Sequence, residues 1–227
     1  MRTFTALLIF TSGCFAADDL ARLRDRQDQG ALEKAAVSLH ADADKAGSDA
    51  NRWYQAAIAY SYLAEVTYEK RDKAGSERAA EAGVKDAEKA IAINSKIGDY
   101  YRVLGTLCGQ VIPANPIMGA LAYGKRAKDA LDRAIEMDPA SSKAHVAHGV
   151  GFYYLPTNFG GGPDNAIKDY KQAIALDPRN AEAYLWLGVA YAKQHQDAQA
   201  REAFTKSLKL DPDRVWTKEQ LAKLPTQ

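Results

Sequence analysis

The sequence predicts an all-α protein built as a row of recurring helices. The first observation is a pattern of aromatic, small and proline residues in residues 181–212. The second is that residues of these kinds recur, in the same order, in three earlier stretches of the chain. The third is that leucine and alanine recur at helical spacing in residues 20–46, which indicates helix before the first of these stretches.

The pattern is clearest in residues 181–212. Its members are Tyr184, Leu187, Gly188, Tyr191, Ala200, Phe204, Ser207 and Pro212. This stretch resembles a tetratricopeptide repeat (TPR), a helix-turn-helix unit of roughly 34 residues. Gly188 and Ala200 have the small size that two helices need where they cross at close approach.

One such unit cannot bury its own apolar face, so neighbouring repeats are expected. The resemblance implies a TPR-type right-handed superhelix of antiparallel helix pairs. We expect a single domain over residues 17–227, with insertions of 14, ten and five residues inside the first three repeats. The predicted repeats are 50–95, 98–139, 142–178 and 181–212, followed by a capping helix in 213–227.

The first 16 residues have the order of a secretory signal peptide. Arg2 precedes an apolar run from Phe4 to Phe10, and small residues lead to a cleavage site after Ala16. We therefore expect a periplasmic or secreted protein of a bacterial cell. Lipidation at Cys14 is an alternative, although Thr11 stands where a lipoprotein signal usually has an aliphatic residue. No later apolar segment is long enough to cross a membrane.

Charge and cysteine content narrow the classes of function. The chain has 30 basic and 29 acidic residues, so it lacks the basic excess expected of a nucleic-acid-binding protein. Cys108 is the one cysteine after residue 16, so it has no partner for an internal disulfide. We expect a small buried thiol at this position and not a reactive one.

Two insertions have distinct compositions. Residues 111–118 contain two prolines, which break a helix, and apolar residues that should not be left in water. Residues 155–163 contain three consecutive glycines and end in Pro163, which suits the first turn of a helix. We expect this second insertion to be a shaped turn that places Phe159 over the core.

Candidate chemical motifs are weak. Residues 119–126 nearly match a phosphate-binding loop, but Arg126 replaces the hydroxyl that would bind magnesium, and a helix start is the better interpretation. His145 and His148 lie on one helical face, yet no third metal ligand is evident. We find no catalytic constellation, and we predict no enzyme activity, no cofactor and no metal site.

TPR proteins commonly use the first helix of each repeat to line a concave groove that receives a peptide or a helix. The leading hypothesis is a binding scaffold or adaptor of the bacterial cell envelope, with a protein or peptide partner in an apolar and aromatic groove. The alternative is a small-ligand-binding accessory component of a periplasmic transport system, for which the tyrosines would form a pocket wall. The resemblance places these residues in the groove: Tyr54, Ile58, Tyr62, Arg102, Thr106, Lys143, Val146, Val150, Tyr153, Tyr154, Leu185 and Val189.

Overall fold

A computed structural model describes residues 17–225, which are helical and contain no strand. The longer helices are α1 (Ala17–Asp25), α2 (Gln29–Ala46), α3 (Ala50–Glu69), α4 (Lys73–Ile93), α5 (Gly98–Val111), α7 (Lys125–Met137), α8 (Ser142–Tyr154), α9 (Pro163–Leu176), α10 (Ala181–Lys193), α11 (Asp197–Leu210) and α12 (Val215–Ala222). Short helical segments occupy the insertions: η1 (Ile112–Ala114), α6 (Pro116–Gly119), η2 (Ala120–Gly124) and η3 (Thr157–Phe159).

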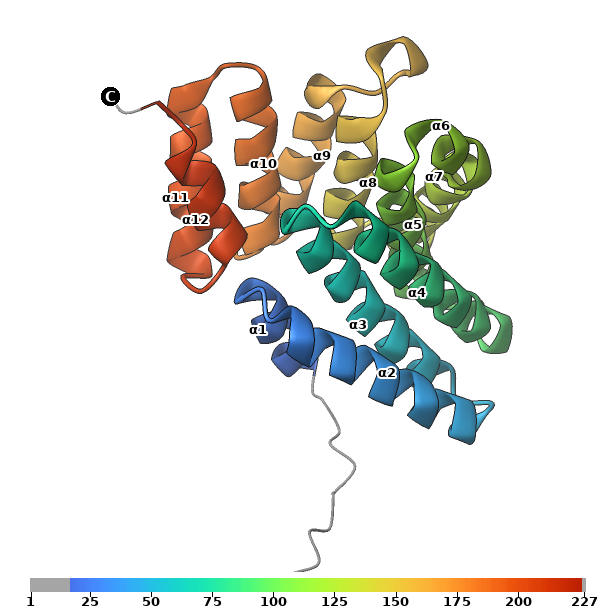
Figure 1. Cartoon of the computed structure of the whole chain (residues 1–227). Helices are drawn as coiled ribbons and strands as arrows, with labels where there is room; N and C mark the ends of the chain where they lie inside the picture. Colours follow the sequence, from blue (N-terminus) through green and yellow to red (C-terminus); the bar gives the residue numbers. More distant parts are fainter. Residues whose placement is uncertain (1–16, 226–227) are drawn as a thin grey trace, which may run out of the picture.

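The helices pack as consecutive pairs. The pairs are α3 with α4, α5 with α7, α8 with α9 and α10 with α11, and each pair also contacts the next (Figure 1). Helix α2 covers α3 at one end, and α12 packs against α11 at the other. The predicted fold class, a TPR-type superhelix with insertions and a capping helix, is confirmed.

Polar residues begin several of these helices. The side chains of Asp49, Asp72, Ser141 and Asn180 accept hydrogen bonds from the first backbone N–H groups of α3, α4, α8 and α10. Such N-caps satisfy donors that have no partner within the helix. The extra residues of the first pair lengthen its helices: α3 has 20 residues and α4 has 21, against 13 in α10 and 14 in α11.

Glycines lie where paired helices cross. A Cβ atom on Gly188 would lie 2.6 Å from the ring of Phe204, and one on Gly149 would lie 2.6 Å from the ring of Tyr170. Each aromatic ring therefore packs directly on the backbone of the facing helix, which agrees with the reason given above for a small residue at Gly188.

Several apolar side chains of the two insertions are exposed, contrary to the prediction. We expected their apolar side chains to pack on the protein, but Ile117 is 76% exposed and Phe159 is 71% exposed. The side chains of Met118 and Leu121 are exposed as well. The prediction that Phe159 lies over the core is wrong.

The backbone of each insertion explains this outcome. The N–H of Gly161 donates to the carbonyl of Pro156, and that of Gly162 donates to the carbonyl of Phe152, so the turn closes on its own backbone. In the other insertion Gly119 packs against the backbone of Ile112, where a Cβ would lie 2.8 Å from Cα. Each insertion is therefore supported by its glycines. Ile117, Met118 and Phe159 remain exposed, whereas Val111 at the start of the first insertion is buried in the core.

Candidate partner-binding site

The first helices of the four pairs, α3, α5, α8 and α10, carry all twelve predicted groove residues. Three of them are buried: Ile58, Val146 and Leu185. Val146 packs in a cluster with Ala173 and Ala183, and Leu185 lies in the cluster that contains Phe204 and Leu224. These three side chains therefore contribute packing between helices and little accessible surface.

Tyr54 and Arg102 meet on one carboxylate. The hydroxyl of Tyr54 donates to Asp99, and Arg102 Nη2 donates to the same carboxylate at 2.9 Å. Burial alone would raise the pKa of Asp99, but the hydrogen bonds from Arg102 and Tyr54 lower it below its ordinary value. Burial and the charge of Asp99 together raise the pKa of the Tyr54 hydroxyl. These predicted groove residues therefore form a polar network within the protein.

Tyr62 is also engaged within the protein. It packs against the largest core cluster, and the guanidinium of Arg24 lies 5.0 Å from its ring centroid, within the range of a cation–π contact. Burial raises the pKa of the Tyr62 hydroxyl. Thr106 lies on the neighbouring helix α5, and its hydroxyl is buried without a hydrogen-bond partner among the described residues.

The other end of the predicted groove carries an aromatic group, which we define as Tyr153, Tyr154, Trp186 and Trp216. The ring centroid of Trp186 lies 6.0 Å from that of Tyr153, 6.3 Å from that of Tyr154 and 5.2 Å from that of Trp216. Tyr154 is 52% exposed. The ammonium of Lys193 lies 4.9 Å from the ring centroid of Tyr153. Val150, Val189 and Lys143 complete the predicted set, and Lys143 is exposed.

Trp186 and Trp216 were not among the predicted groove residues. Trp186 follows Leu185 directly, so helical geometry turns the two side chains to different sides of α10. Leu185 packs against Phe204 of α11, whereas Trp186 faces Tyr153 of α8 and Trp216 of α12. Trp216 comes from the capping helix α12, whose position depends on the whole stack and which carries no repeat pattern.

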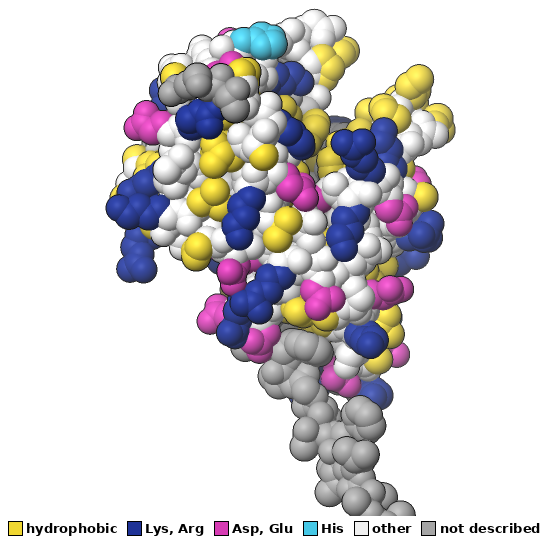
Figure 2. All heavy atoms as spheres, turned by 60° about the vertical axis from the view of Figure 1, so that its left-hand side comes forward, with side chains coloured by type: hydrophobic (Ala, Val, Ile, Leu, Met, Phe, Trp, Pro, Cys, Tyr) yellow, Lys and Arg dark blue, Asp and Glu magenta, His cyan; other side chains and the backbone are white. Residues whose placement is uncertain are grey.

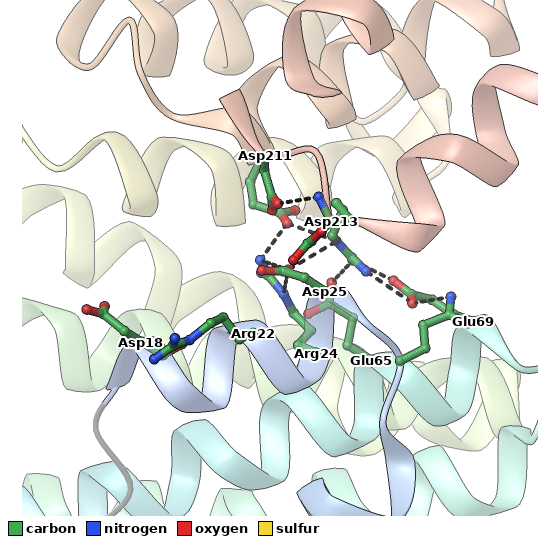
Figure 3. Close-up of polar contacts among 11 residues, drawn as sticks. Asp18, Arg22, Arg24, Asp25, Glu65, Glu69, Asp211 and Asp213 are labelled. Atoms are coloured by element: carbon green, nitrogen blue, oxygen red, sulfur yellow. Dashed lines mark hydrogen bonds and ion pairs between the residues drawn. The ribbon is translucent and has the colours of Figure 1, made fainter. Parts of the chain in front are cut away.

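A buried ion cluster joins the two ends of the stack. Arg214 precedes α12 and is only 1% exposed. Its Nη2 atom lies 2.5 Å from Glu65 Oε1 and 2.6 Å from Glu69 Oε1, both on α3. Figure 3 shows side chains from α1, α3 and the turn before α12 pointing toward one another. We define the closing cluster as Arg24, Asp25, Glu65, Glu69, Glu182 and Arg214.

Charge in the closing cluster is unbalanced. Four carboxylates surround two guanidinium groups, and Arg24 and Arg214 both reach Glu182, at 3.0 Å and 3.2 Å. Burial, partly offset by Arg214 and Arg24, raises the pKa of Glu65 to about 7. Burial would also raise the pKa of Glu182, but the two arginines outweigh it and lower the value. The sequence offered no signal for this cluster, because its members are far apart in the chain.

The histidines are hydrogen-bonded residues at a helix junction. His148 Nδ1 lies 2.8 Å from Asp169 Oδ2, and its Nε2 lies 3.2 Å from Asp132 Oδ1. Burial would lower the pKa of His148, but the two carboxylates outweigh it and raise the value. In residues 17–225 no group of three or more His, Cys, Asp or Glu side chains is arranged to bind a metal ion.

Cys108 agrees with the sequence prediction. The thiol is buried in the largest core cluster, and burial raises its pKa to about 11. The surface has a hollow of about 200 Å³ beside Arg102 and Lys143 and another of about 350 Å³ beside Trp53 and Ile93. None of the four groove tyrosines lines either hollow. Among the described residues, no helix has the length and apolarity needed to span a bilayer.

Three sequence families match the chain. Residues 18–155 match the family described as regulator of microtubule dynamics protein 1-3. Residues 163–195 match a TPR repeat family, and residues 181–214 match the tetratricopeptide repeat family. The matches together extend over both halves of the helix stack.

Two curated relatives are TPR proteins. The chain is 34% identical over 108 residues to small glutamine-rich tetratricopeptide repeat-containing protein 2 of Mycosarcoma maydis, which covers 48% of this chain and 29% of that protein. It is 44% identical over 55 residues to tetratricopeptide repeat protein 6 of Homo sapiens, which covers 24% of this chain and 11% of that protein. The alignments therefore span less than a third of either relative.

Two solved structures share the fold. A thermophilic TPR protein of Thermus thermophilus superimposes with a TM-score of 0.63 at 18% identity, covering 91% of this chain and 97% of that one. The HusA haemophore from Porphyromonas gingivalis superimposes with a TM-score of 0.57 at 18% identity, covering 77% and 94%. At this level of identity the likeness shows the fold alone.

Proposed function

The chain belongs to the regulator of microtubule dynamics protein 1-3 family, and from this premise we propose that it is a non-enzymatic scaffold that binds a protein partner on its concave face. It is a TPR-containing protein, and TPR proteins bind protein or peptide partners. The regulation of microtubule dynamics named in the family's description is a property of the proteins after which the family is named, and we do not assign it to this chain.

The aromatic group carries this proposal. Tyr154 is half exposed beside Tyr153 and Trp186, although a helix stack has no internal need for large aromatic side chains on its concave side. Accessible tyrosine and tryptophan side chains are frequent anchors of protein interfaces, and each contributes about 2 kcal/mol or more when it is central to the contact. The partner segment is therefore an apolar or aromatic face of a peptide or helix.

The groove chemistry disfavours recognition of a free carboxylate. TPR proteins that bind a C-terminal carboxylate use lysine or arginine together with asparagine. The positions that would carry the asparagine are here Ile58, Thr106, Val150 and Val189. Arg102 is paired with Asp99, so its charge is already compensated. Recognition on this face therefore depends on apolar contact.

We also propose that the protein acts in the bacterial cell envelope after export. The support is the order of charged, apolar and small residues in positions 1–16, which lie outside the described residues. A binding scaffold in the envelope would assemble other exported proteins. Lipidation at Cys14 would place the same scaffold on a membrane surface.

A peptide-display selection on the purified protein tests the proposed function. We expect enriched peptides with apolar or aromatic residues at helical spacing, and loss of their binding in a Tyr154→Ser variant. Phe159→Ser is the matched control, since this exposed aromatic residue lies outside the groove. Selected peptides that bind Tyr154→Ser as tightly as the parent protein would place the site elsewhere.

A further inference from the structure

Among the described residues, the most exposed of the large apolar side chains lie on the insertions that join the helices of two pairs. Ile117, Met118 and Leu121 project from the insertion between α5 and α7, and Phe159 projects from the one between α8 and α9. Soluble proteins rarely leave several large apolar side chains on prominent segments without a binding role. The proposed groove on the concave face does not account for these residues.

Both insertions lie at the same end of the stack. Each follows the first helix of its pair, and Figure 1 shows α6 and the turn between α8 and α9 at the upper end of the helices. Figure 2 shows hydrophobic side chains on two projections at the top of the molecule, separated by a notch. We call this surface the insertion edge. The described residues do not cover its apolar tips.

Basic residues accompany the apolar tips. The turn between α3 and α4 carries Lys70, Arg71 and Lys73, which are exposed and form no ion pair with the described residues. Lys125 and Arg126 directly follow the insertion that carries Leu121, but they pair with Asp129 and Glu88, so the uncompensated positive charge lies on the turn between α3 and α4. In Figure 2 a group of dark blue side chains lies just below the notch between the two apolar projections. The insertion edge therefore combines apolar tips with positive charge.

The turns at the opposite end of the stack have a different composition. They contain Asp138, Asp177, Asp211 and Asp213, and they are not predominantly basic. The whole chain has a net charge of only +1, so the positive charge of the insertion edge reflects where the charges lie and not an overall excess.

We propose that the insertion edge is a peripheral membrane-docking surface whose partner is an anionic lipid bilayer. Apolar side chains on a protruding segment can enter the boundary between headgroups and acyl chains, while neighbouring lysines and arginines are attracted to anionic headgroups. Two separate projections can enter a fluid bilayer at the same time, whereas a rigid protein partner would need two matching pockets.

Charge argues against a second copy of the chain as the partner. In a twofold contact between two insertion edges, Lys70, Arg71 and Lys73 of each molecule would approach the same residues of the other. Repulsion between these like charges disfavours such a contact. An anionic surface instead attracts the same lysine and arginine side chains.

Co-sedimentation with lipid vesicles tests the proposal. We expect the purified protein to bind vesicles of phosphatidylcholine mixed with phosphatidylglycerol more tightly than vesicles of phosphatidylcholine alone, with binding weakened by salt. Replacing both Ile117 and Leu121 by Glu should lower the affinity at least about tenfold, since two charges would have to enter the apolar boundary. Replacing Lys70 and Lys73 by Glu should weaken binding to the anionic vesicles by at least about tenfold.

The chain offers a matched control. Ile93 and Ile97 are also exposed, at 42% and 40%, but they lie at the turn between α4 and α5 at the opposite end of the stack. The pair of substitutions Ile93→Glu and Ile97→Glu adds the same charge and should leave vesicle binding unchanged. Phe159→Glu provides an independent variant on the second projection and should weaken binding as well.

Three results would overturn the proposal. The first is equal vesicle binding by the parent protein and the Ile117 and Leu121 variant, which would assign any binding to another part of the chain, including its N-terminus. The second is an equal loss of vesicle binding in the control variant with Ile93→Glu and Ile97→Glu. The third is a parent protein that forms dimers in size-exclusion chromatography while the Ile117 and Leu121 variant is monomeric, because the partner would then be a second copy.

Discussion

Arg214 and Glu65 are 149 positions apart in the chain, yet the guanidinium Nη2 of one lies 2.5 Å from the carboxylate Oε1 of the other. The contact joins the turn before the last helix to α3, near the beginning of the stack. Since Arg214 also reaches Glu69 and Glu182, this one side chain connects elements from both ends of the superhelix.

Removing the Arg214 charge should strongly destabilise the protein. In Arg214→Met, the buried carboxylates of Glu65 and Glu69 would lose their main counter-charge, and breaking a buried pair in this way costs about 3–5 kcal/mol. Urea denaturation followed by circular dichroism measures the change. The control is Arg26→Met, which removes an exposed ion pair between the turn after α1 and Asp213 in the turn before α12, and should leave the midpoint unchanged. Equal midpoints for parent and Arg214→Met would contradict the assigned role.

Glu65 should make stability depend on pH. Its pKa is raised to about 7 in the folded protein, above the ordinary value of 4.5, so the folded state binds more protons between these values. The free energy of unfolding should therefore contain a contribution that is fully present below the unfolded pKa and is lost as pH rises through the folded pKa. Glu65→Gln removes this contribution. Between about pH 5 and about pH 8, the free energy of unfolding measured by denaturation should fall less in the variant than in the parent. Identical decreases would show that Glu65 titrates normally.

Gly188 should not tolerate even a methyl group. A Cβ at this position would lie 2.6 Å from Phe204, so Gly188→Ala should force the helices apart and cost about 1–3 kcal/mol of stability. Gly109 is the matched control, because it also lies within a helix and its Cβ would meet no atom within 4 Å. Gly109→Ala should leave stability unchanged or raise it by about 0.5–1 kcal/mol. If Gly188→Ala and Gly109→Ala unfolded at the same temperature in thermal melts, the close packing of Gly188 on Phe204 would be contradicted.

Export should remove the first 16 residues. The prediction depends on the apolar run after Arg2 and the small residues that end at Ala16. N-terminal sequencing of the protein recovered from the cell envelope should begin at Ala17. Modification of Cys14 by lipid would instead give a blocked N-terminus at that residue. An intact Met1 on protein from the cytoplasm would contradict export altogether.

Local patterns in the sequence were sufficient to predict the repeating fold. Gly188 and Phe204 lie in the same repeat, and the geometry of one helix pair determines whether they touch. Because each repeat contacts mainly its neighbours, a residue pattern that specifies one pair also specifies how the next pair stacks on it. The helix pairs, the capping helix and the buried thiol of Cys108 could therefore be predicted before any coordinates were known.

The arrangement of the surface depended on the tertiary structure. Whether Arg214 reaches Glu65 depends on the accumulated rotation of all the pairs between them, including three insertions whose lengths and shapes differ. The exposure of Phe159 depends on backbone hydrogen bonds that close its turn, which composition alone does not reveal. The sequence by itself determined which helices form and how adjacent pairs pack, because those contacts are short in range. Only the tertiary structure decided which distant charges meet and which apolar side chains remain exposed, because small rotations at each repeat add up along the stack.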